Sequence, residues 1–368
     1  MKLTGLFKRH SRKIKSLVLH IGTPKTGTTA IQGFLAHNRK NLIQQKVLYP
    51  ECGVPENQHT ALVKSIASPL FDWAHFNKAI DQFDANQYVM DILRNCEING
   101  FNKVILSSEY FWASPSMQAG PAYHLPSPEN FDYITNFIRS CRDIFCIFEN
   151  IKIVVYLRRQ DEWFDSFFNQ QLKDGFPIPS ANELLIGVKN YLLYHANLAI
   201  WAEYFGKDNL VVRNYDHLLD GDVVKDFIKI AGINPQSLIQ PKKTQDLVNA
   251  KLSRKSAALM QKTIDMNLNR ELQALLSQVL QGLSSNRIPV KRRREYTLFD
   301  PDFYSSVLAL YHEDNKKLSE DYINLDSTES IEMPAFSQDE HNKLKSIGGD
   351  IENLIGTLLK EIEKTKQR

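Results

Sequence analysis

Short apolar runs, each ended by turn or polar residues, predict the strands of a parallel sheet. They cover residues 17–21, 103–109, 151–157 and 209–213. Runs of this length that do not alternate with polar residues are typical of strands buried on both faces. Between them, apolar residues at helical spacing predict helices over about 28–46, 60–98, 129–146, from 161 onward, and 223–231. The order favours an α/β fold in which a parallel sheet of about four or five strands is flanked by helices.

The pattern downstream of the last strand is helical. Helices are expected over about 250–283, around residues 303–318 and over 338–366. The last of these is expected to pack on the body of the protein or on a second subunit, so a homo-oligomer is possible. We find no internal repeat and no interdomain linker. The predicted organisation is a basic N-terminal arm (1–16), one domain (17–330) and a C-terminal helix (331–368).

Composition and charge narrow the class of protein. A hydrophobic content of 43% supports a packed core, and a formal net charge of +3 is too small to argue for nucleic acid. Two clusters are basic: the N-terminal arm and Lys291-Arg292-Arg293-Arg294. The four cysteines form no metal-binding or disulfide pattern, and no stretch has the length of a membrane span. A cytoplasmic protein without a metal site is the expectation.

One stretch combines a strand, a loop and a helix start. The first strand runs into Gly22-Thr23-Pro24-Lys25-Thr26-Gly27-Thr28-Thr29, and the first helix follows. Loop amides and the positive end of a helix dipole then point at one spot, where Lys25 adds a charge and the threonines add hydroxyls. This arrangement predicts a site for a phosphate or sulfate group. The loop is not a Walker A sequence, because Thr28 stands where that pattern has its lysine.

A second stretch carries groups that suit a phosphate. The strand over residues 151–157 leads directly to Arg158, and Ser166 follows eight positions later in the next predicted helix. This spacing can bring a guanidinium and a hydroxyl around one phosphate.

The two stretches resemble a known family. T-P-K-T-G-T-T and Y-L-R-R-Q-D-E-W-F-D-S are similar to the two nucleotide-binding motifs of sulfotransferases that use PAPS (3′-phosphoadenosine 5′-phosphosulfate). The likeness is strongest to bacterial-type enzymes that modify sugars, glycans or glycolipids, and it covers most of residues 16–325. It implies a P-loop-like fold and transfer of a sulfuryl group from PAPS to a hydroxyl or amine, with no metal required.

The resemblance also implies residue roles. Lys25 would stabilise the leaving nucleotide, while Thr26, Gly27, Thr28 and Thr29 would cradle the 5′-phosphosulfate. Arg158 and Ser166 would bind the 3′-phosphate of PAPS. The cluster at Lys291 resembles a basic loop near the C-terminus of glycosaminoglycan sulfotransferases, although it lacks that loop's glycine, and it reads equally well as a solvated charge run.

The general base and the reaction class leave alternatives open. His59 is the favoured base because its ordinary pKa suits the role, with Glu109 second and Glu51 third. A P-loop kinase-like phosphotransferase using ATP is the main rival, although no carboxylate for magnesium directly follows the strands. A non-catalytic protein whose basic patches bind an anionic polymer is a further alternative.

Overall fold

The computed structural model describes the chain in segments that fall into two compact units. The described residues are 16–52, 57–68, 83–113, 131–175, 180–218, 222–239, 251–252, 254–265, 270–283, 298–299 and 301–323. Unit 1 takes its residues from 1–160, 182–244 and 311–326, and unit 2 from 161–181, 245–310 and 327–368. The basic arm, the Lys291–Arg294 cluster and the helix expected over 338–366 lie outside the described residues.

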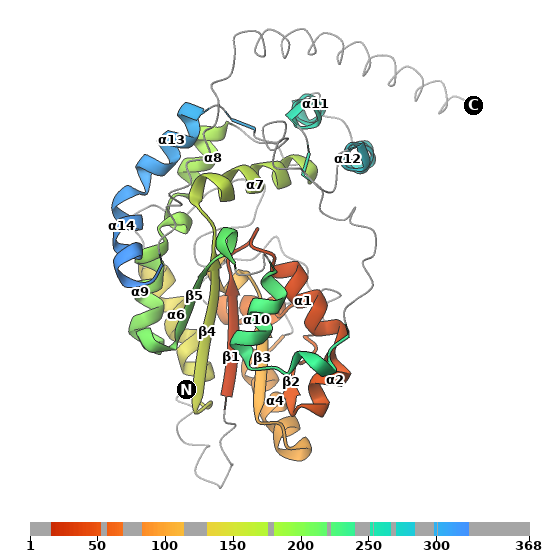
Figure 1. Cartoon of the computed structure of the whole chain (residues 1–368), viewed down its shortest axis with the longest axis vertical. Helices are drawn as coiled ribbons and strands as arrows, with labels where there is room; N and C mark the ends of the chain where they lie inside the picture. The colour runs from red at the N-terminus through yellow and green to blue at the C-terminus, as the bar shows by residue number, and fades with distance from the viewer. Residues whose placement is uncertain are drawn as a thin grey trace, which may run out of the picture. The chain divides into compact units, whose positions relative to one another are not determined.

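Unit 1 is built on a five-stranded parallel sheet (Figure 1). Its strands are β1 (Ser16–Gly22), β2 (Val47–Leu48), β3 (Lys103–Ser107), β4 (Asn150–Leu157) and β5 (Leu210–Asn214). The order is β2-β3-β1-β4-β5, so β1 lies in the middle, with Leu17 opposite Val104 on one side and Ile151 on the other. All four strand runs that the apolar pattern predicted are present, and the parallel α/β fold is confirmed. The two-residue strand β2 at the sheet edge was not predicted.

Helices cover both faces of this sheet. On one face, α1 (Thr28–His37), α2 (Arg39–Gln44) and α10 (Val223–Ala231) pack on Val18, Ile105 and Val154. Figure 1 shows α1 and α10 over the near face of β1 and β3, with α6 on the far side. The remaining helices of unit 1 are α3 (Thr60–Ala67), α4 (Ala85–Asn99), α5 (Tyr110–Ala113), α6 (Phe131–Phe145), α8 (Ala181–Val188, which begins at the unit boundary), α9 (Tyr194–Phe205) and α14 (His312–Asp321).

Short 3-10 helices lie between the main elements of unit 1. They cover Asn190–Leu192, Lys207–Asn209, Tyr215–His217 and Pro235–Ser237. The α14 helix is joined by a buried amide pair to Gln160, which lies three positions after the end of β4. Gln160 Nε2 donates to Asn315 Oδ1 at 2.7 Å, and Asn315 Nδ2 donates to Gln160 Oε1 at 3.1 Å. Because both amides are buried, each satisfies a group that would otherwise lack a partner.

Unit 2 is helical in its described residues. It contains α7 (Gln160–Lys173, continuous with the end of unit 1), α11 (Arg254–Asp265), α12 (Arg270–Leu283) and α13 (Pro301–Leu310). Within this unit, the buried carboxylate of Asp165 accepts hydrogen bonds from the Tyr304 hydroxyl at 2.8 Å and the Leu298 amide at 2.9 Å and pairs with Lys251. A buried carboxylate with three such partners is fully compensated. Burial, with the Asp165 charge second, raises the pKa of Tyr304.

One predicted helix is interrupted. The sequence predicts a continuous helix over 28–46, whereas the structure has two helices separated at Asn38, so this prediction was wrong in its extent. The buried amide of Asn38 explains the break: Nδ2 donates to Ile239 O at 2.9 Å and Oδ1 accepts from Ile239 N at 2.7 Å. A tertiary anchor therefore interrupts a stretch that local pattern favours as helix.

Two further properties concern the whole described chain. Cys52, Cys96, Cys141 and Cys146 form no disulfide. Within the segments that the structure describes, none of the helices combines the length and apolar character needed to span a bilayer.

Candidate functional site

The loop after β1 is held in place by backbone geometry and by β4. The amide and the hydroxyl of Thr23 both donate to Tyr156 O, at 3.0 and 3.1 Å. The Thr26 hydroxyl donates to Thr23 O at 2.5 Å, which closes the loop on itself. Lys25 has a φ of 67° and Gly27 a φ of 77°, both in the left-handed region. The loop is thus a tight turn with its own internal bonds, as an anion-binding loop requires.

Gly27 joins the loop to the helices that cover the sheet. A β-carbon at this position would lie 2.8 Å from Val223 Cγ1 and 3.3 Å from Tyr215 Cε2, so only glycine fits. Gly27 is also the N-cap of α1, and its carbonyl accepts the first helical hydrogen bonds, from Ala30 and Ile31. The loop therefore leads directly into a helix N-terminus.

The N-terminus of α1 has the character of an anion site. No acidic side chain lies in its first turn. Thr28 is buried and Thr29 is exposed. The first amides of a helix have no partner within the helix and carry partial positive charge. Together with the half-buried Lys25 in the preceding loop, they supply positive charge at the predicted phosphate or sulfate site. The hydroxyl proton of Thr26 is committed to Thr23, so Thr26 can donate to an anion only through its backbone amide.

Glu109 lies against the base of this loop. It follows β3 by two residues, and a β-carbon built on Gly22 would be 3.0 Å from Glu109 Cα. Gln32, which is buried on α1, donates from Nε2 to Glu109 Oε2 at 2.9 Å. A carboxylate predicted from its position at a strand end is therefore next to the anion loop, at the carboxyl edge of the sheet where ligands of α/β proteins bind.

Arg158 extends the site along the same edge. It follows β4, and its Nε lies 3.2 Å from Asp216 Oδ1. Its guanidinium carbon lies 5.8 Å from the centre of the Tyr215 ring. Tyr215 also faces Gly27, so this ring lies between the loop and Arg158. The ion pair and the ring together orient the guanidinium.

Ser166 belongs to the other unit. It is half-buried on α7, in unit 2, whereas Arg158 is in unit 1. The pairing of Arg158 with Ser166 around one phosphate stays a prediction.

His59 is buried, and its ring is bonded to backbone. Nε2 lies 3.1 Å from Pro50 O, and Nδ1 lies 3.1 Å from the Ser107 amide. The tautomer that satisfies both contacts carries its proton on Nε2, which leaves Nδ1 as the acceptor of the Ser107 proton. Burial lowers the pKa of His59 to about 4. The ring therefore connects the chain at Pro50 to the end of β3, and its lone pair is already engaged.

A second buried histidine, His20, contacts the same strand end as His59. His20 on β1 has its Nδ1 2.8 Å from Ser107 Oγ, and its ring packs edge-on to Tyr156 and beside Phe227. Burial lowers the pKa of His20 to about 3. Ser107 thus contacts both histidines, through its side chain and through its backbone, and fixes the strand end that precedes Glu109.

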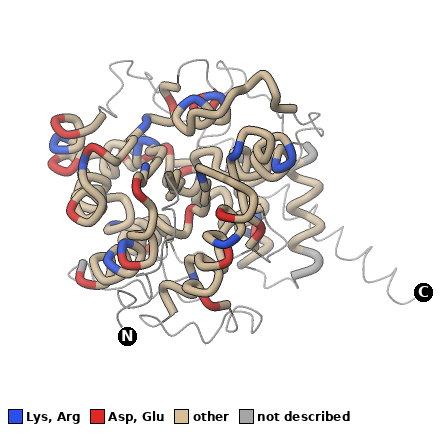
Figure 2. The backbone as a smooth tube through the Cα atoms, turned by 90° about the horizontal axis from the view of Figure 1, so that it is seen from below, with Lys and Arg blue, Asp and Glu red and all other residues tan. Residues whose placement is uncertain are grey.

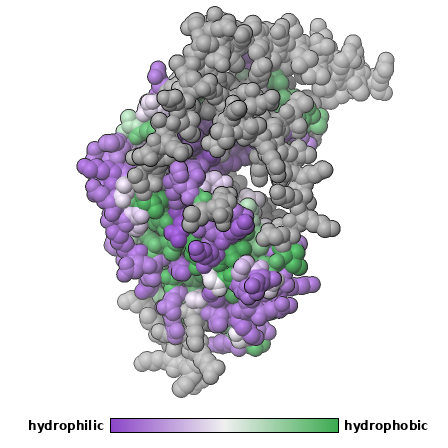
Figure 3. All heavy atoms as spheres, in the orientation of Figure 1, coloured by the Kyte–Doolittle hydropathy of each residue, from purple (hydrophilic) through white to green (hydrophobic). Residues whose placement is uncertain are grey.

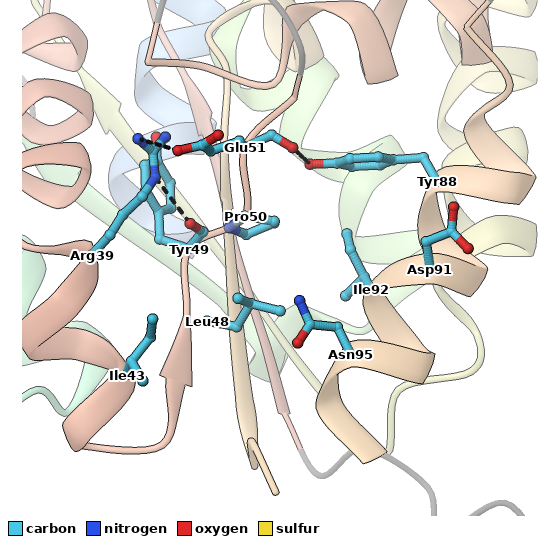
Figure 4. Close-up of a pocket in the computed structure, with 10 residues that line it drawn as sticks. All are labelled: Arg39, Ile43, Leu48, Tyr49, Pro50, Glu51, Tyr88, Asp91, Ile92 and Asn95. Atoms are coloured by element: carbon cyan, nitrogen blue, oxygen red, sulfur yellow. Dashed lines mark hydrogen bonds and ion pairs between the residues drawn. The ribbon is translucent and has the colours of Figure 1, made fainter. Parts of the chain in front are cut away.

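A cavity of about 390 Å³ lies elsewhere, at the β2 edge of the sheet (Figure 4). Figure 4 shows Ile43 of α2, Leu48 of β2 and Ile92 of α4 around it. Of the predicted site residues it includes Glu51, the third candidate base, whose Oε1 lies 3.5 Å from Arg39 NH1 and whose side chain is 80% exposed. The cavity is distinct from the anion loop, since no residue of 22–29 lines it.

The described surface has mixed polarity. Basic and acidic positions are interspersed over the described backbone (Figure 2). On the face drawn in Figure 3, hydrophilic side chains cover most of the described surface around smaller hydrophobic areas. In the described segments, no group of three or more His, Cys, Asp and Glu side chains is arranged to hold a metal ion.

Two residues of the site were not found from the sequence. Gln32 falls on a predicted helix, where a polar residue reads as solvent-facing. Tyr215 follows a predicted strand, and this place at a strand end was the signal that could have identified it as a site residue. Their contacts join residues 77 and 57 positions apart, which no local pattern reveals.

Known proteins resemble this chain in part. No family model matches the chain. An uncharacterized protein of Archaeoglobus fulgidus is 30% identical over 177 residues, which are 46% of this chain and 45% of that protein. The chain thus spans about half the length of this relative. A solved sulfotransferase structure from Alicyclobacillus acidocaldarius is 15% identical, with a TM-score of 0.40, over 73% of this chain and 96% of that one. A likeness of this degree does not establish an activity.

Proposed function

We propose that the chain transfers a sulfuryl group from PAPS to a hydroxyl or amine of a sugar, glycan or glycolipid acceptor. One arrangement carries the proposal: the loop with Lys25, the carboxylate of Glu109 and the guanidinium of Arg158 lie at the same edge of one sheet, joined by contacts through Gly22, Gly27 and Tyr215. An anion site with a carboxylate and a second cation beside it suits transfer of a charged group to a neutral acceptor.

The residues of the loop would bind and neutralise the donor. PAPS supplies the sulfuryl group and a nucleotide leaving group. The amides of Gly27, Thr28 and Thr29 and the N-terminus of α1 would hold the 5′-phosphosulfate, with the Thr26 amide beside them. Lys25 would stabilise the charge that develops on the oxygen leaving with the nucleotide. Because lysine and helix dipole carry this charge, the mechanism requires no metal.

The 3′-phosphate would engage the second cationic group. Arg158 can offer its guanidinium to a phosphate while Asp216 and the Tyr215 ring hold its plane. This contact is what would distinguish PAP, the desulfated product, from ADP.

Glu109 is the base that the geometry favours. The carboxylate would take the acceptor's hydroxyl or amine proton as the new bond to sulfur forms and the bond to the leaving phosphate oxygen breaks. It is bonded through one oxygen to Gln32 and lies against the anion loop. His59, the base favoured by the sequence, has both ring nitrogens in contact with backbone groups, so we assign it a supporting role.

The test is a transfer assay with [³⁵S]PAPS and a panel of glycosides, amino sugars and glycolipids, run in EDTA. Labelled product should form without added metal. Lys25→Ala should lose about 100-fold or more in rate, Glu109→Gln should lose a similar amount, and Lys40→Ala, an exposed lysine on α2, should match wild type. Labelled phosphate transfer from ATP with magnesium, and none from PAPS, would establish the kinase-like alternative instead.

A further inference from the structure

Glu109 is fixed through its backbone, while its carboxylate accepts a hydrogen bond from a residue on a different element. Its carbonyl accepts from the amides of Trp112 and Ala113, and the preceding Ser108 amide donates to His20 O. Gly22 lies against its α-carbon. These contacts fix where the side chain starts, but the direction of the carboxylate depends on what its oxygens bind.

Gln32 supplies a donor to that carboxylate. It lies on α1, one turn beyond the helix start, and its side chain is 5% exposed although it is polar. The helix packs on the sheet through its apolar residues Ile31, Phe34 and Leu35, whereas Gln32 reaches Glu109 Oε2 at 2.9 Å. A buried amide on this helix is accounted for by the hydrogen bond it makes.

We propose that Gln32 is a positioning residue that orients the Glu109 carboxylate toward the acceptor and keeps it ionised. This inference rests on the proposed function and assigns a role within the same site. An amide N–H that donates to a carboxylate stabilises its charged form and fixes its plane. Gln32 lies on the helix whose N-terminus forms the proposed anion site. One rigid helix therefore positions both the bound PAPS and the base.

The experiment compares Gln32→Leu and Gln32→Glu with wild type. Leucine has similar volume and no donor, and glutamate has the same shape but replaces the donor with a second carboxylate. Gln44→Leu is the matched control, because Gln44 is exposed on the neighbouring α2 helix. The measurements are the affinity for PAP and kcat/KM against pH, with [³⁵S]PAPS and the glycoside that gives the highest rate in the panel.

Loss of the donor should move the acid limb of the kcat/KM profile to higher pH by about 1 unit in Gln32→Leu and further in Gln32→Glu, because the base becomes harder to ionise. On the acid limb of the profile, below the pKa values of both proteins, the rate of Gln32→Leu should be about 10-fold lower than wild type, and the difference should disappear as the pH rises. PAP affinity should stay within about 2-fold of wild type, since Gln32 is not assigned to the nucleotide. Gln44→Leu should give the wild-type profile.

The possible results distinguish a failure of this inference from a failure of the proposed function. A Gln32→Leu profile that superimposes on wild type overturns the inference alone, and so does a loss of rate that is the same at every pH, which is the signature of a structural role. Wild-type protein that transfers no label to any acceptor overturns the proposed function and the inference together.

Discussion

Substituting Gly27 by alanine should destabilise the protein and disturb the anion loop, while the same change six residues later should stabilise it. Gly27 has a φ of 77°, and a β-carbon there would lie 2.8 Å from Val223 Cγ1. Gly33 lies inside α1, and beyond its chain neighbours and the backbone of its own helix no heavy atom lies within 4 Å of the position where a β-carbon would be. The pair therefore tests one substitution in two backbone settings on the same helix.

The expected magnitudes follow from two separate costs. An alanine in the left-handed region costs about 1–2 kcal/mol. Overpacking adds about 1–3 kcal/mol, because Val223 lies in a core with Phe227 and cannot move freely. Gly27→Ala should therefore lose about 2–5 kcal/mol of the free energy of unfolding. Gly33→Ala should gain about 0.5–1 kcal/mol, because alanine is the better helix former.

Urea unfolding followed by circular dichroism measures both effects as shifts of the midpoint at unchanged slope. PAP affinity measured on the same variants should fall in Gly27→Ala and remain unchanged in Gly33→Ala. A Gly27→Ala protein as stable as wild type would refute the reasoning, because it would mean that the loop does not have this backbone conformation or this contact with α10.

Two further predictions concern buried polar groups. Burial lowers the pKa of His20 to about 3 and of His59 to about 4, from 6.5. Between these values and pH 6.5 the unfolded chain therefore takes up protons that the folded chain does not. The free energy of unfolding should fall as the pH drops from 6.5 toward 4, with a slope approaching about 2.7 kcal/mol per pH unit. Replacing His20 by leucine should remove about half of that slope in urea unfolding measured at several pH values, and an unchanged slope would contradict this. For the Gln160–Asn315 pair, each single change to leucine should cost about 1–3 kcal/mol by leaving one buried amide unsatisfied. A double-mutant cycle should find that the double variant costs less than the sum, and strict additivity would exclude the coupling.

The sheet and the anion loop were predictable because their signals are local. An apolar run, two glycines and a helix start lie within residues 17–31, and each element follows from its own few residues. The position of Glu109 at the sheet edge also followed from the rule that strand ends face the ligand crevice. These features depend on neighbours in sequence or on a general property of parallel sheets.

The features that sequence reasoning missed depend on distant contacts. The break at Asn38 comes from its bonds to Ile239, 201 positions away. The buried state of His59 comes from Ser107 and Pro50, which are brought to its ring by the fold.

The measurement that tests the central claim most directly is a calorimetric titration of PAP and ADP against wild type, Arg158→Ala and Arg94→Ala. The two nucleotides each carry two phosphates, but PAP has its second phosphate on the 3′ oxygen whereas ADP has it on the 5′ chain. Arg94 is an exposed control arginine on α4. PAP should bind wild type and Arg94→Ala at least about 10-fold more tightly than ADP, a difference of about 1.4 kcal/mol, and Arg158→Ala should lose that preference. Equal binding of PAP and ADP to wild type, or a preference that survives in Arg158→Ala, would contradict the account.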